Sequence, residues 1–82
     1  PFNPQTSISF HLSDNGDVNL SVYNIKGQKI KTIVNKQLEQ GLHQIIWDGK
    51  NDNNQYVASG VYFYELKVNN KNIAIKKCLL LK

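Results

Sequence analysis

The 82-residue chain contains no arginine and no methionine, and Cys78 is its only cysteine. Its ten basic residues are all lysines, and the formal net charge is +4. Because arginine is the usual reader of base edges, we expect no binding to nucleic acid. A single cysteine cannot form a disulfide within the chain. The sequence also lacks a signal-peptide pattern and an apolar run of about 18 residues, so we expect no membrane-spanning helix.

The length predicts one domain over residues 1–82, because so short a chain can bury only about 60–65% of its unfolded surface. Residues 1–5 include Pro1 and Pro4, which predict an extended lead-in. The chain opens without an initiator methionine. We therefore expect it to be covalently part of a larger protein.

The stretch from Val57 to Val68 has the strongest pattern in the sequence. After the small residues 58–60, it alternates between two faces, one with Tyr62, Tyr64, Leu66 and Val68, the other with Val61, Phe63, Glu65 and Lys67. This period of two, in β-branched and aromatic residues, predicts a strand. Apolar residues on both faces predict that its first half is covered on both sides, in the middle of a sheet. Gly60 indicates either a close approach or a positive φ.

Shorter alternating stretches predict the other strands, over residues 6–12, 17–24, 29–34, 42–48, 56–57 and 73–81. Residues 35–41 and 49–55 are polar and are predicted to be loops. The stretch 29–34 carries lysines and an imperfect alternation, which is typical of a sheet edge. This count and spacing predict an all-β fold, a β-sandwich of about seven antiparallel strands. The predicted core consists of Ile8, Phe10, Val18, Leu20, Val22, Ile45, Trp47, Tyr62, Tyr64 and Leu66.

The loop from Asp48 to Asn54 has carboxylate and amide oxygens, which are the ligands that Ca²⁺ prefers. However, Lys50 lies in the middle of the loop, and no bidentate glutamate follows at the end. We interpret the loop as a solvated turn and predict no metal site and no cofactor.

Four other residues have side chains that catalyse reactions in enzymes. Neither His11 nor His43 has a partner at ligand spacing, and we expect His43 to pack near Trp47. Cys78 lies in an apolar strand, which favours a buried structural thiol. Ser59 lacks the spacing of a nucleophile elbow. We predict no catalytic residues, no small-molecule substrate and no enzymatic activity.

The C-terminal end has more apolar residues than a solvated strand needs. Lys76 and Lys77 are adjacent, so one of them must point toward the sandwich or lie at its rim. Leu79, Leu80 and Leu81 place apolar groups on both faces. These leucines could pack on the lead-in residues or form a surface for a partner.

Five motifs in order give the chain a family resemblance: Pro1-Phe2-Asn3-Pro4, Tyr23-Asn24-Ile25-Lys26-Gly27-Gln28, Trp47-Asp48-Gly49, Ala58-Ser59-Gly60-Val61-Tyr62-Phe63-Tyr64 and the ending Lys76-Lys77…Leu79-Leu80-Leu81-Lys82. The chain resembles the C-terminal sorting domain (type A) of type IX secretion cargo. That family is similar to the immunoglobulin-like domain of flagellar hook-capping proteins. Two departures are a lead-in that lacks its first residues and Cys78 in place of the more usual methionine or other apolar residue.

The resemblance implies an immunoglobulin-like sandwich that directs a larger cargo across the outer membrane to the cell surface. Its partners would be the secretion machinery at the outer membrane and a cell-surface processing peptidase. The implied recognition residues are Lys76, Lys77, Leu79, Leu80, Leu81 and Lys82, and the structural motif residues are Gly60, Tyr62, Trp47 and Gly49. The alternatives are a structural or adhesive spacer or interaction module, similar to the hook cap, and a carbohydrate-binding module that would use Tyr23, Tyr56 and Phe63.

Overall fold

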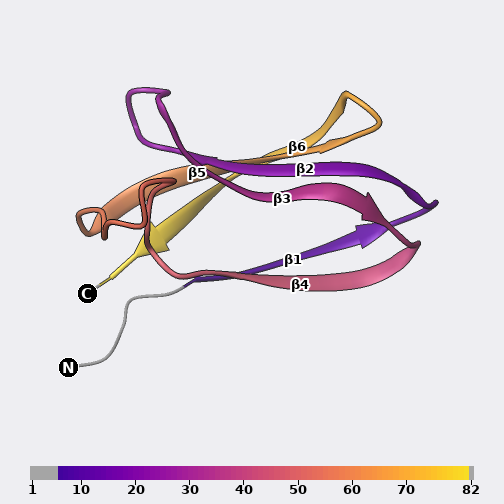
Figure 1. Cartoon of the computed structure of the whole chain (residues 1–82), viewed down its shortest axis with the longest axis horizontal. Coiled ribbons are helices and arrows are strands. Elements are labelled where there is room, and N and C mark those ends of the chain that lie inside the picture. The colour runs from indigo at the N-terminus through magenta and orange to yellow at the C-terminus, as the bar shows by residue number, and fades with distance from the viewer. Residues whose placement is uncertain (1–5, 82) are drawn as a thin grey trace.

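The fold is a sandwich of two antiparallel β-sheets (Figure 1). The computed structural model describes residues 6–81, so the predicted lead-in over residues 1–5 and the candidate residue Lys82 lie outside the described residues. Within this range the six strands are β1 (Thr6–Leu12), β2 (Gly16–Tyr23), β3 (Lys29–Leu38), β4 (Gly41–Trp47), β5 (Gly60–Val68) and β6 (Lys71–Leu80). The described residues form no helix, and therefore none long and apolar enough to cross a membrane.

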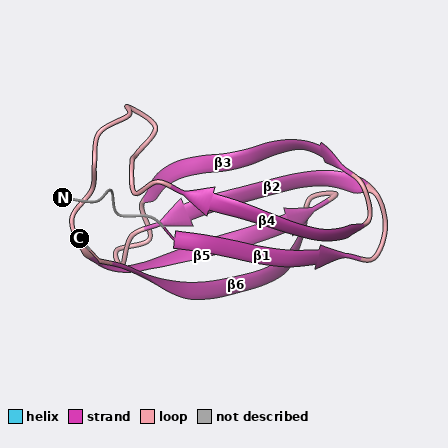
Figure 2. Cartoon of the chain, turned by 90° about the horizontal axis from the view of Figure 1, so that it is seen from below, coloured by secondary structure: helices cyan, strands magenta, loops and turns pink. Residues whose placement is uncertain are grey.

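The two sheets differ in width. The smaller sheet contains β1 and β4, and the larger has the order β3-β2-β5-β6. Figure 2 shows β1 and β4 in front of the middle of the larger sheet, with β3 and β6 extending past them on either side. Strand β5 pairs with both β2 and β6, which confirms its predicted place in the middle of a sheet.

The structure has one strand fewer than the seven predicted. Residues 56–57 were expected to form a short strand, but Tyr56 forms only an isolated bridge with Lys50. The polar residues between them curl back on themselves and leave no neighbouring strand for a longer pairing. The all-β sandwich is confirmed with this small difference.

The core lies between the sheets. Seven of the ten predicted core residues are buried, and Phe10, Ile45 and Tyr64 are half-buried against them. Leu12, Val34 and Leu80 also belong to the core but were absent from the prediction. Leu80 is buried because the inner face of β6 still points toward the core at the C-terminal end of the strand.

Two β-bulges explain the imperfect pattern of β3. Its register against β2 shifts between Leu20 and Ser21 and again between Val22 and Tyr23. The residues skipped on β3 are Ile33 and Ile30, and both pack against the core. A bulge adds one residue to a strand and therefore resets the alternation of its side chains. The predicted edge position of this strand is confirmed.

Strand β3 is longer than predicted. The sequence placed a loop over residues 35–41, but the strand continues through Asn35 and Lys36 to Leu38. These polar residues pair with β2 from Asn19 back to Gly16. An edge strand exposed to solvent can hold polar side chains, because its backbone ladder forms without burial of both faces.

Candidate interaction surface

Trp47 anchors the corner at which β4 ends. Its indole is 1% exposed and meets the ring of Tyr62 edge to face, with 5.1 Å between the ring centroids. Its Nε1 donates a hydrogen bond of 2.9 Å to the carbonyl oxygen of Lys50, so no polar group of the indole is left unpaired. Gly49, with φ of 78°, makes the turn that brings this carbonyl back over the indole.

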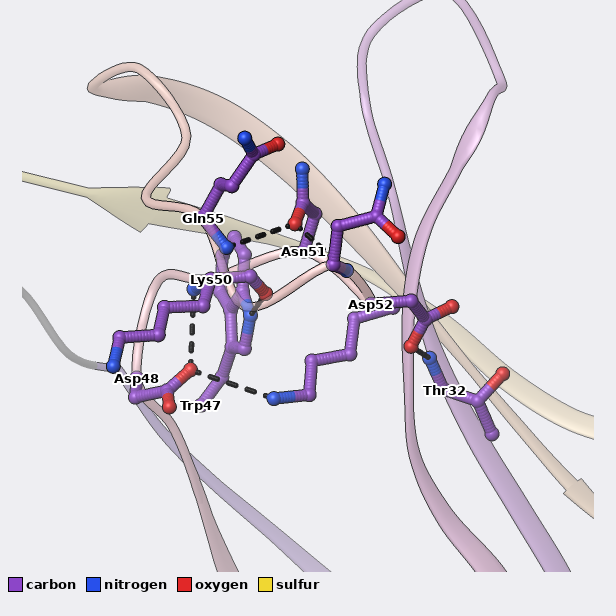
Figure 3. A network of polar contacts seen from close by, with 9 residues as sticks. Thr32, Trp47, Asp48, Lys50, Asn51, Asp52 and Gln55 are labelled. Atoms are coloured by element: carbon purple, nitrogen blue, oxygen red, sulfur yellow. Dashed lines mark hydrogen bonds and ion pairs between the residues drawn. The ribbon is translucent and has the colours of Figure 1, made fainter.

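Polar side chains of the loop after Trp47 bind their own backbone (Figure 3). Asp48 Oδ1 accepts a hydrogen bond of 3.1 Å from the amide of Lys50. Asn51 Oδ1 accepts hydrogen bonds from the amides of Asn53 and Gln55, at 2.9 and 3.0 Å. Such Asx turns hold a polar loop in shape without a bound ion.

Asp52 fastens the same loop to the edge of the larger sheet. Its amide donates to the carbonyl oxygen of Ile30 at 3.0 Å, and its Oδ1 accepts from the amide of Thr32 at 3.3 Å. Both partners lie on β3, an edge strand with backbone groups open to other chains. The loop therefore covers part of this edge, a common way of preventing unwanted strand pairing.

Three of the side chains that suggested calcium, Asp48, Asn51 and Asp52, accept these hydrogen bonds. Asp48 also forms an ion pair of 3.7 Å with Lys31. Among residues 6–81, no three His, Cys, Asp or Glu side chains group closely enough to hold a metal ion.

Gly60 and Tyr62 form the entry to β5. Gly60 has φ of 152°, and a Cβ built there would meet no atom within 4 Å. The glycine is therefore required by its backbone conformation and not by a close approach. The Tyr62 hydroxyl donates a hydrogen bond of 2.6 Å to the carbonyl oxygen of Ala58. This bond holds the residues before β5 close to the start of the strand.

The two histidines and the cysteine differ in their burial and in their neighbours. His43 lies on the inner face of β4, as predicted, but its ring stacks on Phe10 at 5.5 Å and not on Trp47. Its Nε2 is 2.7 Å from the carbonyl oxygen of Glu39. His11 is exposed on β1. Cys78 is buried opposite Tyr62, as predicted, and desolvation raises the pKa of its thiol above the ordinary value of 9.0.

Strand β6 separates the predicted recognition residues onto two faces. Lys77 lies on the outer face of the larger sheet opposite Phe63, and Lys76 lies opposite Tyr64 in inner-face register but remains exposed at the rim. Leu79 and Leu81 are exposed. Leu80 is fully buried, so its side chain belongs to the core and is unavailable to a partner. The recognition role of these residues stays a prediction.

The outer face of the larger sheet was predicted incorrectly. Because Val61 and Phe63 are apolar, the sequence indicated that a second layer would cover them, but Val61 is exposed and Phe63 is half-buried. The sandwich has only two layers, and β1 and β4 cover the opposite face. The apolar residues Val61 and Phe63 therefore mark an exposed apolar face and not a buried one.

One row of side chains crosses all four strands of this outer face. Register pairs join Lys29 on β3 to Tyr23 on β2, Tyr23 to Phe63 on β5, and Phe63 to Lys77 on β6. Two neighbouring aromatic residues are thus bracketed by two lysines. The sequence alone does not reveal this arrangement, because it depends on the order of the strands.

A shallow hollow of about 470 Å³ lies beside the aromatic pair. Its lining comes from the β2–β3 turn and the middle of β5 and β6: Tyr23, Asn24, Ile25, Gly27, Phe63, Glu65 and Ile75. Asn24 shapes the turn, because its Oδ1 accepts hydrogen bonds of 2.9 Å from the amides of Lys26 and Gln28. The Tyr23 hydroxyl donates to Glu65 Oε1 at 3.3 Å. Desolvation, and then the nearby Glu65 carboxylate, raise the pKa of Tyr23 above its ordinary value of 10.0.

Comparison with known proteins places this geometry in a family. Residues 2–72 match the family model described as the FlgD Ig-like domain. The chain is also similar to the crystal structure of FlgD from P. aeruginosa, with 24% identity and a TM-score of 0.76, over 93% of this chain and 60% of that one. At this identity the likeness shows the fold alone. No curated protein matches the chain in sequence. The family match spans most of the chain, which therefore belongs to the FlgD Ig-like domain family.

Proposed function

We propose that this domain is a non-catalytic interaction module of a larger protein, of the hook-cap type. The observation that carries the proposal is the set of exposed apolar side chains on β6 and its surroundings, Ile25, Val61, Ile73, Ile75, Leu79 and Leu81. Val61 and Leu79 are register partners on the outer face, and Ile25 and Ile75 line one hollow. Apolar side chains that gather on an exposed face in this way usually mark a binding surface. The match to the FlgD Ig-like domain family supports the same conclusion.

The position of β6 adds a second kind of contact. It is an edge strand of the larger sheet, with β5 on one side only. An edge strand can pair with an extended segment of a partner through its backbone. A spacer between domains would need neither an open strand edge nor exposed apolar residues beside it, since a covered edge and polar side chains would keep the domain soluble.

Domain replacement in the parent protein separates an interaction module from a spacer. Residues 1–82 would be exchanged for an unrelated immunoglobulin-like sandwich of similar length, and the parent's assembly into its native structure would be measured. We expect assembly to be lost although the parent is still made in normal amounts. Full assembly with the unrelated sandwich would contradict the proposal and favour a spacer.

A second candidate function is an export address on a larger cargo. It is favoured by the five motifs shared with type IX sorting domains and by the exposed Lys76, Lys77, Leu79 and Leu81 on or directly after β6. The partners would then be the secretion machinery at the outer membrane and a cell-surface processing peptidase. The cargo would be secreted or held at the cell surface after passing through the periplasm.

The export address is tested by removing its charge from a full-length cargo. Lys76→Ala with Lys77→Ala should block export and leave the sandwich folded, because surface lysines contribute less than about 1 kcal/mol to stability. The matched control is Lys31→Ala with Lys36→Ala on β3, the opposite edge of the same sheet. Normal export of the β6 variant would exclude this function, and equal losses from both pairs would show that only net charge is read.

A further inference from the structure

We infer that the outer face of β2, β5 and β6 docks a segment of a partner protein in which an apolar side chain is flanked by carboxylates. This inference rests on the proposed interaction function and identifies its surface and the chemistry of the partner. Lys77 is the one residue that it shares with the candidate recognition residues at the C-terminal end.

The apolar part of the site is the hollow beside Tyr23 and Phe63. Ile25 in the β2–β3 turn and Ile75 on β6 stand on its two sides and are 76% and 62% exposed. Strands β2, β5 and β6 fix the floor, since Tyr23, Phe63 and Lys77 follow one another in register. A hollow of about 470 Å³ with this lining suits one or two large apolar side chains.

The charges around the hollow specify an acidic partner. Lys29 and Lys77 stand at the two ends of the aromatic row, and Lys26 lies in the turn that forms one wall. The single acidic residue within the lining, Glu65, is already engaged by the Tyr23 hydroxyl and by an ion pair of 3.8 Å with Lys67. The rim is therefore positive, and carboxylates on both sides of an apolar residue would complement it.

The same charges disfavour a second copy of this chain as the occupant. A two-fold contact would place this face against itself. Lys29 and Lys77 would then meet the lysines of the other copy with no free carboxylate between them. Like charges across an interface cost free energy, so self-association through this face should be weak.

The outer face of the smaller sheet supplies a matched comparison. It also has two exposed apolar residues, Leu42 and Ile46, which are 76% and 55% exposed. These two are separated by Gln44 and lie opposite His11 and Ser7 on β1. Neither Leu42 nor Ile46 pairs with a Phe, Tyr, Trp or Lys on β1, so this face lacks the row of two large aromatic residues and two lysines found on the larger sheet.

A peptide titration of the 82-residue chain tests the inference. The probe is a synthetic peptide of alternating Glu and Leu with a central Phe, and the control peptide carries Lys in place of Glu. We expect amide chemical shifts to change at residues 23–27, 63–65 and 75–77 with the acidic peptide at millimolar concentration, and not with the basic one. Added salt should weaken the binding. Shift changes elsewhere, equal binding of both peptides or no binding would overturn the inference.

Two pairs of variants locate the site. Ile25→Ser with Ile75→Ser should weaken binding of the acidic peptide by about tenfold or more, because the contact loses two isoleucines that the bound peptide would bury. Leu42→Ser with Ile46→Ser removes similarly exposed residues from the other sheet and should leave binding unchanged. Lys77→Gln should weaken binding severalfold, and Lys36→Gln should not. Equal effects within either comparison would overturn the inference.

The outcome is separable from that of the proposed function. If Ile25→Ser with Ile75→Ser leaves the assembly of the parent protein intact while domain replacement abolishes it, the domain is an interaction module that binds through another surface. Sedimentation of the free chain at high concentration detects self-association, and a dimer abolished by the same variants would overturn the acidic partner in favour of a second copy.

Discussion

Trp47 Nε1 lies 2.9 Å from the carbonyl oxygen of Lys50 and donates a hydrogen bond to it. This contact joins the most buried aromatic residue of the core to the most polar loop of the chain. Because the indole and the loop hold each other in place, the corner after β4 needs no ion to fix it. The same loop then reaches the edge of β3 through Asp52.

Substitutions of Trp47 test this corner. Trp47→Ala should lower the free energy of unfolding by about 3–5 kcal/mol, because it empties a buried site. Trp47→Phe keeps much of the ring but leaves the Lys50 carbonyl without its donor, and should cost about 1–3 kcal/mol. The control is Leu42→Ala, on an exposed side chain, with a change within about 0.5 kcal/mol. An unchanged denaturation midpoint for Trp47→Ala would show that the core is wrong.

Calcium should have no effect on stability. The oxygens of Asp48, Asn51 and Asp52 accept hydrogen bonds from backbone amides, so the loop has its shape without a cation. Thermal unfolding would be followed with millimolar Ca²⁺ and with a chelator, and the two melting temperatures should agree. A rise of several degrees that the chelator reverses would reveal a binding site, since a ligand bound only by the folded state stabilises it.

Cys78 should react slowly with a thiol reagent while the protein is folded. Its side chain is buried, and desolvation raises the thiol pKa above 9.0, so both access and the thiolate fraction are low. In denaturant the same thiol should react at the rate of a free cysteine. Fast labelling of the native protein would contradict the buried position on β6.

Alkaline pH should destabilise the domain. Desolvation raises the pKa values of Tyr23, Tyr62 and Tyr64 above 10.0, in the same direction as that of Cys78. The unfolded chain therefore releases these protons first, and the free energy of unfolding should fall as the pH rises above about 9. Chemical denaturation at pH values from about 8 to 11 measures this slope. A constant or rising stability over this range would contradict the burial of these groups.

The sequence predicted the strands well where each strand has one buried face. The alternation predicted over residues 6–12 and 42–48 corresponds closely to β1 and β4, because these strands bury one face and expose the other. On β3 the two bulges at Ile30 and Ile33 interrupt this relation, so the alternation looked irregular, and the polar residues 35–38 made the strand look short. A bulge depends on the partner strand and leaves no period of its own in the sequence.

The candidate surface could be predicted only in part. Lys76 and Lys77 were expected on opposite sides of a strand, and the register confirms that arrangement. The apolar outer face of β5 was visible as Val61 and Phe63, but burial and partner binding give the same signal in a sequence. The row from Lys29 to Lys77 draws on four strands, so only the topology reveals it.

Competition by the free domain is the most direct test of the central claim that this domain acts by binding a partner. The 82-residue chain would be produced, in the compartment of the parent protein, in excess over it, and the parent's assembly or delivery would be measured. We predict a loss of assembly that grows with the amount of folded domain. Ile25→Ser with Ile75→Ser should relieve this loss, and Leu42→Ser with Ile46→Ser should not. If assembly of the parent is unaffected by a large excess of folded domain, the domain does not act through a saturable partner, and the account is contradicted.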